Sequence, residues 1–178
     1  KALLALYALA KCQQGFERLI PYSEIDNALR KLLIEFGPPR KSWHTEYPFW
    51  RLQNDKIWEI PNQENLNRRK GNTDAKKSEL VRYNIHGGFT KNIYQLLTKN
   101  ISFCGQIAET MLKKSFPESI WNDILNAVGI QLNNNNQISR RRSDFRDRVI
   151  RAYEYKCAIC GYDVKLDSSN LGLEAAHI

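Results

Sequence analysis

The chain has 178 residues, of which 42% are hydrophobic and 26% are charged, and its formal net charge is +8. This length and composition are those of one or two folded domains and exclude wholesale disorder. No apolar run approaches the roughly 20 residues that span a bilayer, so we expect no membrane segment. The basic excess favours an anionic partner, and nucleic acid is the first candidate, because net charge bears on partners rather than on fold.

The four cysteines are too few for a disulfide scaffold at this length. Cys12 and Cys104 stand alone in apolar surroundings, which predicts buried thiols. Cys157 and Cys160 instead form a C-x-x-C pair. We therefore expect a reducing, cytoplasmic setting.

The first residues of the chain show the periodicity of a helix. Apolar residues recur at helical spacing from Lys1 to Ala10, which predicts an amphipathic core helix that stops at Gly15. A second helix is expected to begin at Ser23, a good N-cap residue, and to end at Gly37-Pro38-Pro39. Its predicted apolar stripe consists of Ile25, Leu29, Leu32, Leu33 and Phe36.

The segment 43–52 is rich in aromatic residues, and 56–60 alternates like a half-buried strand. Because Asn54-Asp55 lies between them and favours a turn, we predict a core hairpin. Its buried side chains are expected to be Phe49, Trp50 and Trp58. The polar stretch 62–77 predicts a loop, and Gly87-Gly88 predicts a further break.

Three more helices are predicted over 91–99, 101–115 and 118–128. The four asparagines at 133–136 favour turns and mark a linker. We therefore predict two domains, 1–132 and 140–178, joined by a linker at 133–139. The predicted fold class is α+β and predominantly helical.

A basic segment and a cysteine motif follow the predicted linker. Residues 140–156 hold seven basic and three acidic residues, which is half of the net charge of the chain. The C-x-x-C-G motif that follows could provide two thiolate ligands for zinc, although a structural site needs two more. By itself the pair at Cys157 and Cys160 fits half a metal site or two packed thiols.

The order of these motifs is more informative than the pair. A charged helix predicted over Asp144–Tyr155, then C-x-x-C-G, then Leu-Glu-Ala-Ala-His-Ile at 173–178 resembles the opening of an HNH endonuclease domain of ββα-metal fold. The resemblance implies that His177 is the general base that activates water for attack on a phosphodiester. It also implies a divalent cofactor, Mg²⁺ or Mn²⁺, with structural zinc at Cys157 and Cys160 as an additional site. Because the motif breaks off at Ile178, we expect a truncated module that does not cleave DNA outside its longer parent enzyme.

The N-terminal half carries a second resemblance. Tyr-Pro-Phe-Trp-Arg-Leu at 47–52, then D-x-I-W-E-I at 55–60, after a helix rich in leucine and alanine, resembles a sulfur-binding domain. That domain belongs to McrA-like, phosphorothioate-dependent type IV restriction endonucleases, in which an HNH nuclease typically follows it. The resemblance implies that the partner is double-stranded DNA in which sulfur replaces one nonbridging phosphate oxygen.

The implied pocket suits the chemistry of sulfur, a large and soft atom that accepts hydrogen bonds weakly. Walls made by Tyr47 and the Pro48 ring would desolvate sulfur cheaply, whereas an oxygen would lose water without gaining a donor. Arg51 falls where some family members have a small apolar residue, so either it turns outward to phosphate or the cavity is shaped differently. The full set of implied DNA-binding residues is Lys1, His44, Thr45, Tyr47, Pro48, Arg51, Arg68, Arg69 and Lys70.

Two rival interpretations remain open at this point. An HNH enzyme could instead read methylated or hydroxymethylated cytosine, with Trp43 and His44 stacking on a flipped base. Alternatively, the chain could be a non-enzymatic DNA-binding regulator with a zinc ribbon at Cys157 and Cys160. For the nuclease we expect a homodimer, because cutting both strands usually takes two active sites.

Overall fold

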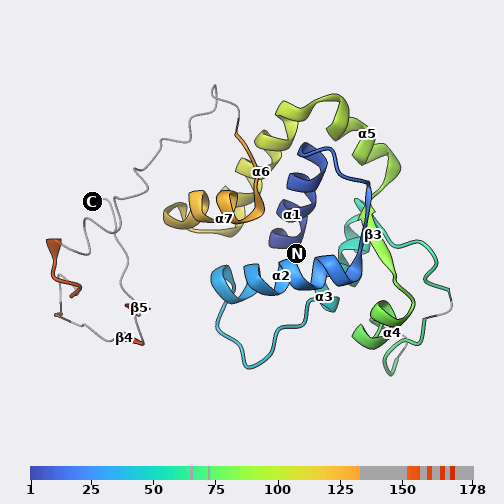
Figure 1. Ribbon diagram of the computed structural model, residues 1–178, viewed down its shortest axis with the longest axis horizontal. Coiled ribbons are helices and arrows are strands. Elements are labelled where there is room, and N and C mark those ends of the chain that lie inside the picture. The colour runs from blue at the N-terminus through green and yellow to red at the C-terminus, as the bar shows by residue number, and fades with distance from the viewer. Residues whose placement is uncertain are drawn as a thin grey trace. The chain divides into compact units, whose positions relative to one another are not determined.

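The computed structural model describes residues 1–64, 66–71, 73–132, 152–156, 160–161, 165–166 and 169–170. By its contacts the chain divides into two compact units, Lys1–Asn133 and Asn134–Ile178. In the second unit, β4 (Lys165–Leu166) pairs with β5 (Ser169–Asn170) in antiparallel fashion. The predicted linker and most of the predicted charged helix lie outside the described residues. The first unit combines helices with a small sheet, which confirms the α+β, predominantly helical expectation for this part (Figure 1).

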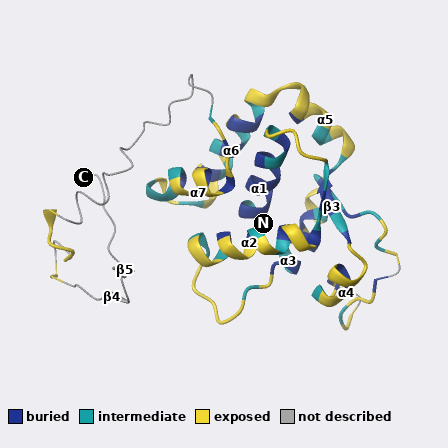
Figure 2. Ribbon diagram, viewed as in Figure 1, coloured by how far each residue is buried: buried dark blue, intermediate teal, exposed yellow. Residues whose placement is uncertain are grey.

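A helix that is buried on nearly every side forms the centre of the first unit. α1 (Ala2–Gln13) buries every residue from Leu3 to Ala10, and Figure 2 shows most of its length in the colour of buried residues. Its alanines and leucines favour helix and leave no polar face, so the amphipathic character that we predicted is wrong. Gly15, with φ +78°, follows the end of the helix as predicted.

Several other helices pack against α1. α2 (Tyr22–Phe36), α5 (Lys91–Lys99), α6 (Ile101–Ser115) and α7 (Trp121–Val128) all contact it. α5 and α6 have the predicted bounds, whereas the helix predicted over 118–128 is a 3-10 turn at Glu118–Ile120 followed by α7.

α2 carries the segment that leads into the aromatic stretch. It ends at Phe36, directly before the predicted Gly37-Pro38-Pro39 stop. It begins at Tyr22 rather than Ser23, because Pro21 is the N-cap residue and its ring holds the entering chain at φ −57°. The buried side chains of α2 are Tyr22, Ile25, Leu29 and Leu32.

Within the described residues of this unit, the sheet is antiparallel with the order β1-β3-β2. β1 (Leu19–Pro21) and β2 (Trp58–Glu59) both pair with β3 (His86–Phe89). The break predicted at Gly87-Gly88 is wrong, because both glycines lie inside β3. A Cβ on Gly88 would lie 1.9 Å from the carbonyl oxygen of Arg18, and one on Gly87 would lie 2.6 Å from the Phe49 ring. Glycine is therefore needed for these close approaches rather than for a turn.

The predicted hairpin is also wrong. Most of the aromatic segment forms a helix, α3 (Glu46–Arg51), followed by the 3-10 turn η1 (Leu52–Asp55), and β2 pairs with β3 instead. Aromatic residues favour strands, but the buried positions 45, 46, 49 and 50 follow a helical period. Phe49, Trp50 and Trp58 are buried, as predicted.

A row of aromatic rings attaches α3 to its neighbours. The ring centroids of Tyr22 and Phe49 are 4.9 Å apart, those of Phe49 and Trp58 are 6.0 Å apart, and those of Trp58 and Phe89 are 5.9 Å apart. All three pairs meet edge to face, which is a preferred aromatic geometry. The inner side of α3 is thereby held between α2 and the sheet, and its outer side remains available.

The described residues between 62 and 76 form a loop, as predicted, whereas Lys77, the last residue of the predicted loop, begins α4 (Lys77–Arg82). Within its described residues, Arg68 and Ala75 form an isolated antiparallel bridge. The backbone N–H of Arg69 also donates to the carbonyl oxygen of Asp74 at 3.0 Å. These contacts fold the loop back on itself, and side-chain hydrogen bonds of Arg69 with Glu46 and of Asp74 with Arg51 hold it beside α3.

Candidate nucleic-acid interface

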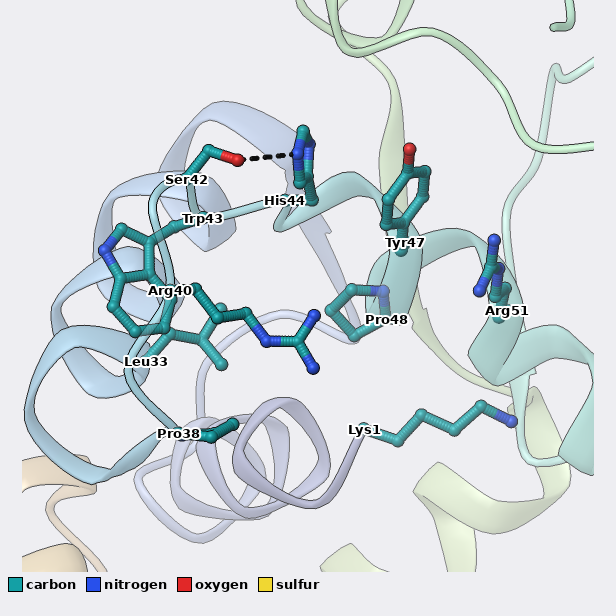
Figure 3. Close-up of a pocket in the computed structure, with 10 residues that line it drawn as sticks. All are labelled: Lys1, Leu33, Pro38, Arg40, Ser42, Trp43, His44, Tyr47, Pro48 and Arg51. Atoms are coloured by element: carbon teal, nitrogen blue, oxygen red, sulfur yellow. Dashed lines mark hydrogen bonds between the residues drawn. The ribbon is translucent and has the colours of Figure 1, made fainter.

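A pocket of about 330 Å³ opens beside α3 in the first unit. Figure 3 shows Tyr47, Pro48 and Arg51 on one side of it and Leu33, Pro38 and Trp43 on the other, with Arg40 extending toward Pro48. The residues that line it are Lys1, Leu33, Pro38, Arg40, Ser42, Trp43, His44, Tyr47, Pro48 and Arg51. Its described lining thus combines three cations with aromatic and proline rings, which suits an anion that also carries apolar surface.

The outer face of α3 supplies one wall. Tyr47, Pro48 and Arg51 are spaced i, i+1 and i+4, so they share one side of a helix, while Phe49 and Trp50 face the core. Pro48 is tolerated because it stands in the first turn, where its missing N–H has no helical partner. Tyr47 and Pro48 are consequently held side by side by a short, well-anchored helix.

Tyr47 is surrounded by rings and cations. The His44 ring stacks on it, with centroids 5.0 Å apart and an interplanar angle of 30°. The Arg51 guanidinium carbon lies 4.6 Å from its ring centroid, and that of Arg69 lies 5.1 Å from it. Cation–π attraction therefore gathers positive charge around the tyrosine from both α3 and the basic loop.

A buried carboxylate, that of Glu46, holds the side chains that surround Tyr47. Glu46 is only 2% exposed, and its Oε1 accepts from Arg69 Nη2 at 3.0 Å and lies 3.1 Å from His44 Nδ1. The His44 Nε2 is in turn 3.0 Å from the Ser42 hydroxyl. Because a buried carboxylate needs partners, Glu46 holds both side chains against Tyr47.

Arg51 has a carboxylate partner of its own. Its Nε donates to both carboxylate oxygens of Asp74, at 3.0 and 3.1 Å, and its Nη2 donates to Oδ2 at 2.5 Å. This hydrogen bonding holds the pKa of Asp74 below its usual value and raises the pKa of Arg51. Both groups are therefore ionised at neutral pH. We expected that Arg51 could turn outward to a phosphate. In this structure its guanidinium instead forms an ion pair with Asp74.

Five of the predicted DNA-binding residues line the pocket: Lys1, His44, Tyr47, Pro48 and Arg51. Arg69 does not line the pocket, but its guanidinium contacts the ring of Tyr47, which does. Arg68 is exposed, with its guanidinium carbon 5.3 Å from the Trp50 ring centroid, and Lys70 is exposed on the same loop. Lys1 forms an exposed ion pair with Asp55 at 2.9 Å.

Thr45 does not occupy the position that we expected for it. We expected it to reach DNA, but it is 0% exposed, and its hydroxyl contacts the carboxylate of Asp26 and the Tyr22 hydroxyl. Lys77 also donates to the Asp26 carboxylate, at 2.7 Å. In this conformation Thr45 stabilises the start of α3 instead of facing a ligand.

Several residues of the site had no recognisable functional signal in the sequence. Leu33, Pro38 and Arg40 line the pocket because α2 ends beside α3. Their only sequence signal is that they flank the Gly-Pro-Pro stop. Glu46 and Asp74 were missed because a carboxylate that positions an arginine has no recognisable local motif.

The predicted metal and catalytic residues cannot be placed in the same way. Cys157 and His177 lie outside the described residues, and Cys160 is exposed. The described part of the chain holds no cluster of three or more His, Cys, Asp or Glu side chains that could bind a metal ion.

Cys12 and Cys104 are both buried, as predicted. Burial raises the pKa of the Cys12 thiol to about 11 and also raises that of Cys104. Both thiols therefore stay protonated at neutral pH and act as core side chains.

In the part of the chain that the structure describes, none of the helices has the length and apolar character needed to span a membrane.

The first unit matches a known family of domains. The model of the ScoMcrA-like DNA sulfur-binding domain matches residues 1–133, and the chain belongs to this family. No curated protein is similar in sequence.

Solved structures give the same fold. The sulfur-binding domain of ScoMcrA complexed with phosphorothioated DNA is 21% identical, with a TM-score of 0.62 over 71% of this chain and 84% of that one. The corresponding SprMcrA complex is 16% identical, with a TM-score of 0.55 over 71% of this chain and 78% of that one. ScoMcrA itself, a type IV phosphorothioation-dependent restriction endonuclease, is 21% identical with a TM-score of 0.65. That match covers 72% of this chain but only 24% of ScoMcrA.

Proposed function

We propose that the first unit binds double-stranded DNA that carries a phosphorothioate linkage, and that the sulfur lies against Tyr47 and Pro48. The observation that carries the proposal is the wall of the pocket, where an aromatic ring and a proline ring stand together on α3 among cations. Two relatives with the same fold were solved in complexes with phosphorothioated DNA, which supports the assignment.

The cations suit a nucleic-acid backbone. Lys1, Arg40 and Arg51 line the pocket, and Arg68 and Lys70 are exposed on the neighbouring loop. Charges spread in this way match consecutive phosphates better than one small anion, and they supply affinity that does not depend on sequence. The selective element must therefore be the apolar wall.

The wall would select sulfur by penalising oxygen. A nonbridging oxygen placed against Tyr47 and Pro48 would lose its water and gain no donor there, at a cost of about 1–3 kcal/mol. Sulfur accepts hydrogen bonds weakly and gains dispersion contacts with the rings, so it avoids most of this cost.

The proposal predicts a measurable preference. The 178-residue chain is titrated with two duplexes of identical sequence at one salt concentration, one of which carries a phosphorothioate. We expect the modified duplex to bind about tenfold more tightly. Equal affinities would contradict the proposal, because the cations alone bind both duplexes alike.

One rival has a structural observation in its favour. Trp43 and the stacked pair His44 and Tyr47 line the pocket, so a flipped, methylated cytosine could stack there. A third duplex, methylated or hydroxymethylated at cytosine, therefore belongs in the same titration. Tighter binding of that duplex alone would favour the rival.

We further propose that the second unit begins the HNH domain of a longer, homodimeric restriction endonuclease. His177 would be the general base, Cys157 and Cys160 would be zinc ligands, and Mg²⁺ or Mn²⁺ would stabilise the charge on phosphate. The support is the order of the sequence motifs.

In the full-length enzyme, we expect His177→Ala to lower cleavage of modified duplex about 100-fold or more without weakening binding. EDTA is expected to stop cleavage in the same assay, because the proposed reaction needs the metal ion. Cleavage at an undiminished rate by the His177→Ala enzyme would contradict the assignment of the base.

A further inference from the structure

An arginine in the wall of the pocket raises a question of specificity. Guanidinium N–H groups form strong, charge-assisted hydrogen bonds to phosphate oxygens. Arg51 is 52% exposed at its side chain and lines the same pocket as Tyr47 and Pro48. If its donors were available, an ordinary phosphate oxygen in the pocket would gain the partner that Tyr47 and Pro48 deny it.

In this structure the Nε–Nη2 edge of the guanidinium, one of the edges that can bind an oxyanion in bidentate fashion, is occupied. The Nε and Nη2 of Arg51 donate to the Asp74 carboxylate, and the guanidinium carbon lies 4.6 Å from the Tyr47 ring centroid. Figure 3 shows the guanidinium beside Tyr47 at the edge of the pocket. The ion pair therefore keeps this end of Arg51 turned to Asp74 and to the tyrosine.

Asp74 is placed to retain its partner. It is 7% exposed and is not among the residues that line the pocket. The hydrogen bond from Arg69 N–H to its carbonyl oxygen anchors its backbone. If Arg51 turned to a phosphate, it would leave a nearly buried carboxylate without its bidentate partner, which is costly.

We propose that Asp74 is a specificity-determining residue, because it occupies the Nε–Nη2 edge of Arg51 and so withholds this bidentate edge from a phosphate oxygen. Arg51 then forms the edge of the pocket, and oxygen remains penalised. The inference rests on the proposed function and adds a residue that acts on DNA only through another side chain.

The direct test is Asp74→Asn, which removes the charge that holds Arg51. The net charge gained raises both affinities, and the freed edge of Arg51 should raise the affinity for ordinary duplex about fivefold more than that for modified duplex, so the sulfur preference falls. Glu109→Gln is the matched control: it removes one carboxylate from the ion pair with Lys113 on α6, which is 2.6 Å long and outside the pocket. The control raises both affinities equally through net charge and leaves their ratio unchanged.

Two further variants decide the matter even if Asp74→Asn folds poorly. Arg51→Lys keeps the charge at a half-exposed position but cannot form the bidentate pair, so it should lower the sulfur preference as Asp74→Asn does. Arg51→Gln combined with Asp74→Asn keeps the net charge and removes both ions, so it should restore the preference.

The outcomes separate the two proposals. If the wild-type chain prefers sulfur and both Arg51→Lys and Asp74→Asn keep the same ratio, the role of Asp74 is overturned and the proposed function stands. If only Asp74→Asn fails to fold, the ratio measured with Arg51→Lys decides alone. A wild-type chain without sulfur preference overturns the proposed function and this inference together.

Discussion

Replacing Tyr47 with alanine is expected to lower the affinity for phosphorothioated duplex about tenfold and to leave the two duplexes nearly equal. The ring is one half of the apolar wall, and it also supports His44, Arg51 and Arg69. Without it, water reaches the bound linkage, so oxygen no longer suffers the loss of hydration that separates it from sulfur. The measurement is the ratio of the two dissociation constants at one salt concentration.

The controls for this prediction come from the same chain. Tyr47→Phe keeps the aromatic face and should keep the ratio. Tyr83→Ala removes an exposed tyrosine outside the pocket that also contacts an arginine, since the Arg82 guanidinium carbon lies 5.3 Å from its ring centroid. It should leave both affinities unchanged. If Tyr47→Ala retains the wild-type ratio while remaining folded, the sulfur does not lie against Tyr47.

The second large effect concerns the sheet that supports α3. Gly88→Ala is expected to destabilise the first unit by about 3 kcal/mol, because the new Cβ would lie 1.9 Å from a backbone carbonyl oxygen, that of Arg18. Gly88 pairs with Leu19 of β1 and with Glu59 of β2, so the clash cannot be relieved by turning one side chain. A loss of this size should lower Tm by about 10 °C.

Gly105→Ala is the matched control for this substitution. Gly105 is buried in α6, but a Cβ there would meet only a Leu132 methyl carbon at 3.5 Å, an ordinary van der Waals distance. Alanine also favours helix over glycine by about 1 kcal/mol, so Tm should stay the same or rise. Equal melting temperatures for Gly88→Ala and the wild type would show that β1 and β3 are not as close as described.

The sequence predicted correctly the element bounds that depend on residues within or next to the element. The bounds of α5 and α6 follow from helical periodicity, and α2 ends where Gly37-Pro38-Pro39 forbids continuation. The aromatic stretch gave a wrong prediction, because Phe49 and Trp50 favour a strand by local propensity. Only the packing of Phe49 against Tyr22 and Trp58 selects the helix.

The candidate site divides along the same line. The basic excess and the adjacency of Tyr47 and Pro48 are visible in the sequence, since they are properties of composition and of neighbouring residues. The burial of Thr45 and the pairing of Arg51 with Asp74 are visible only once the chain has folded. The physical reason is that burial and ion pairing depend on partners distant in the chain, and those partners are specified by how the helices and the sheet pack.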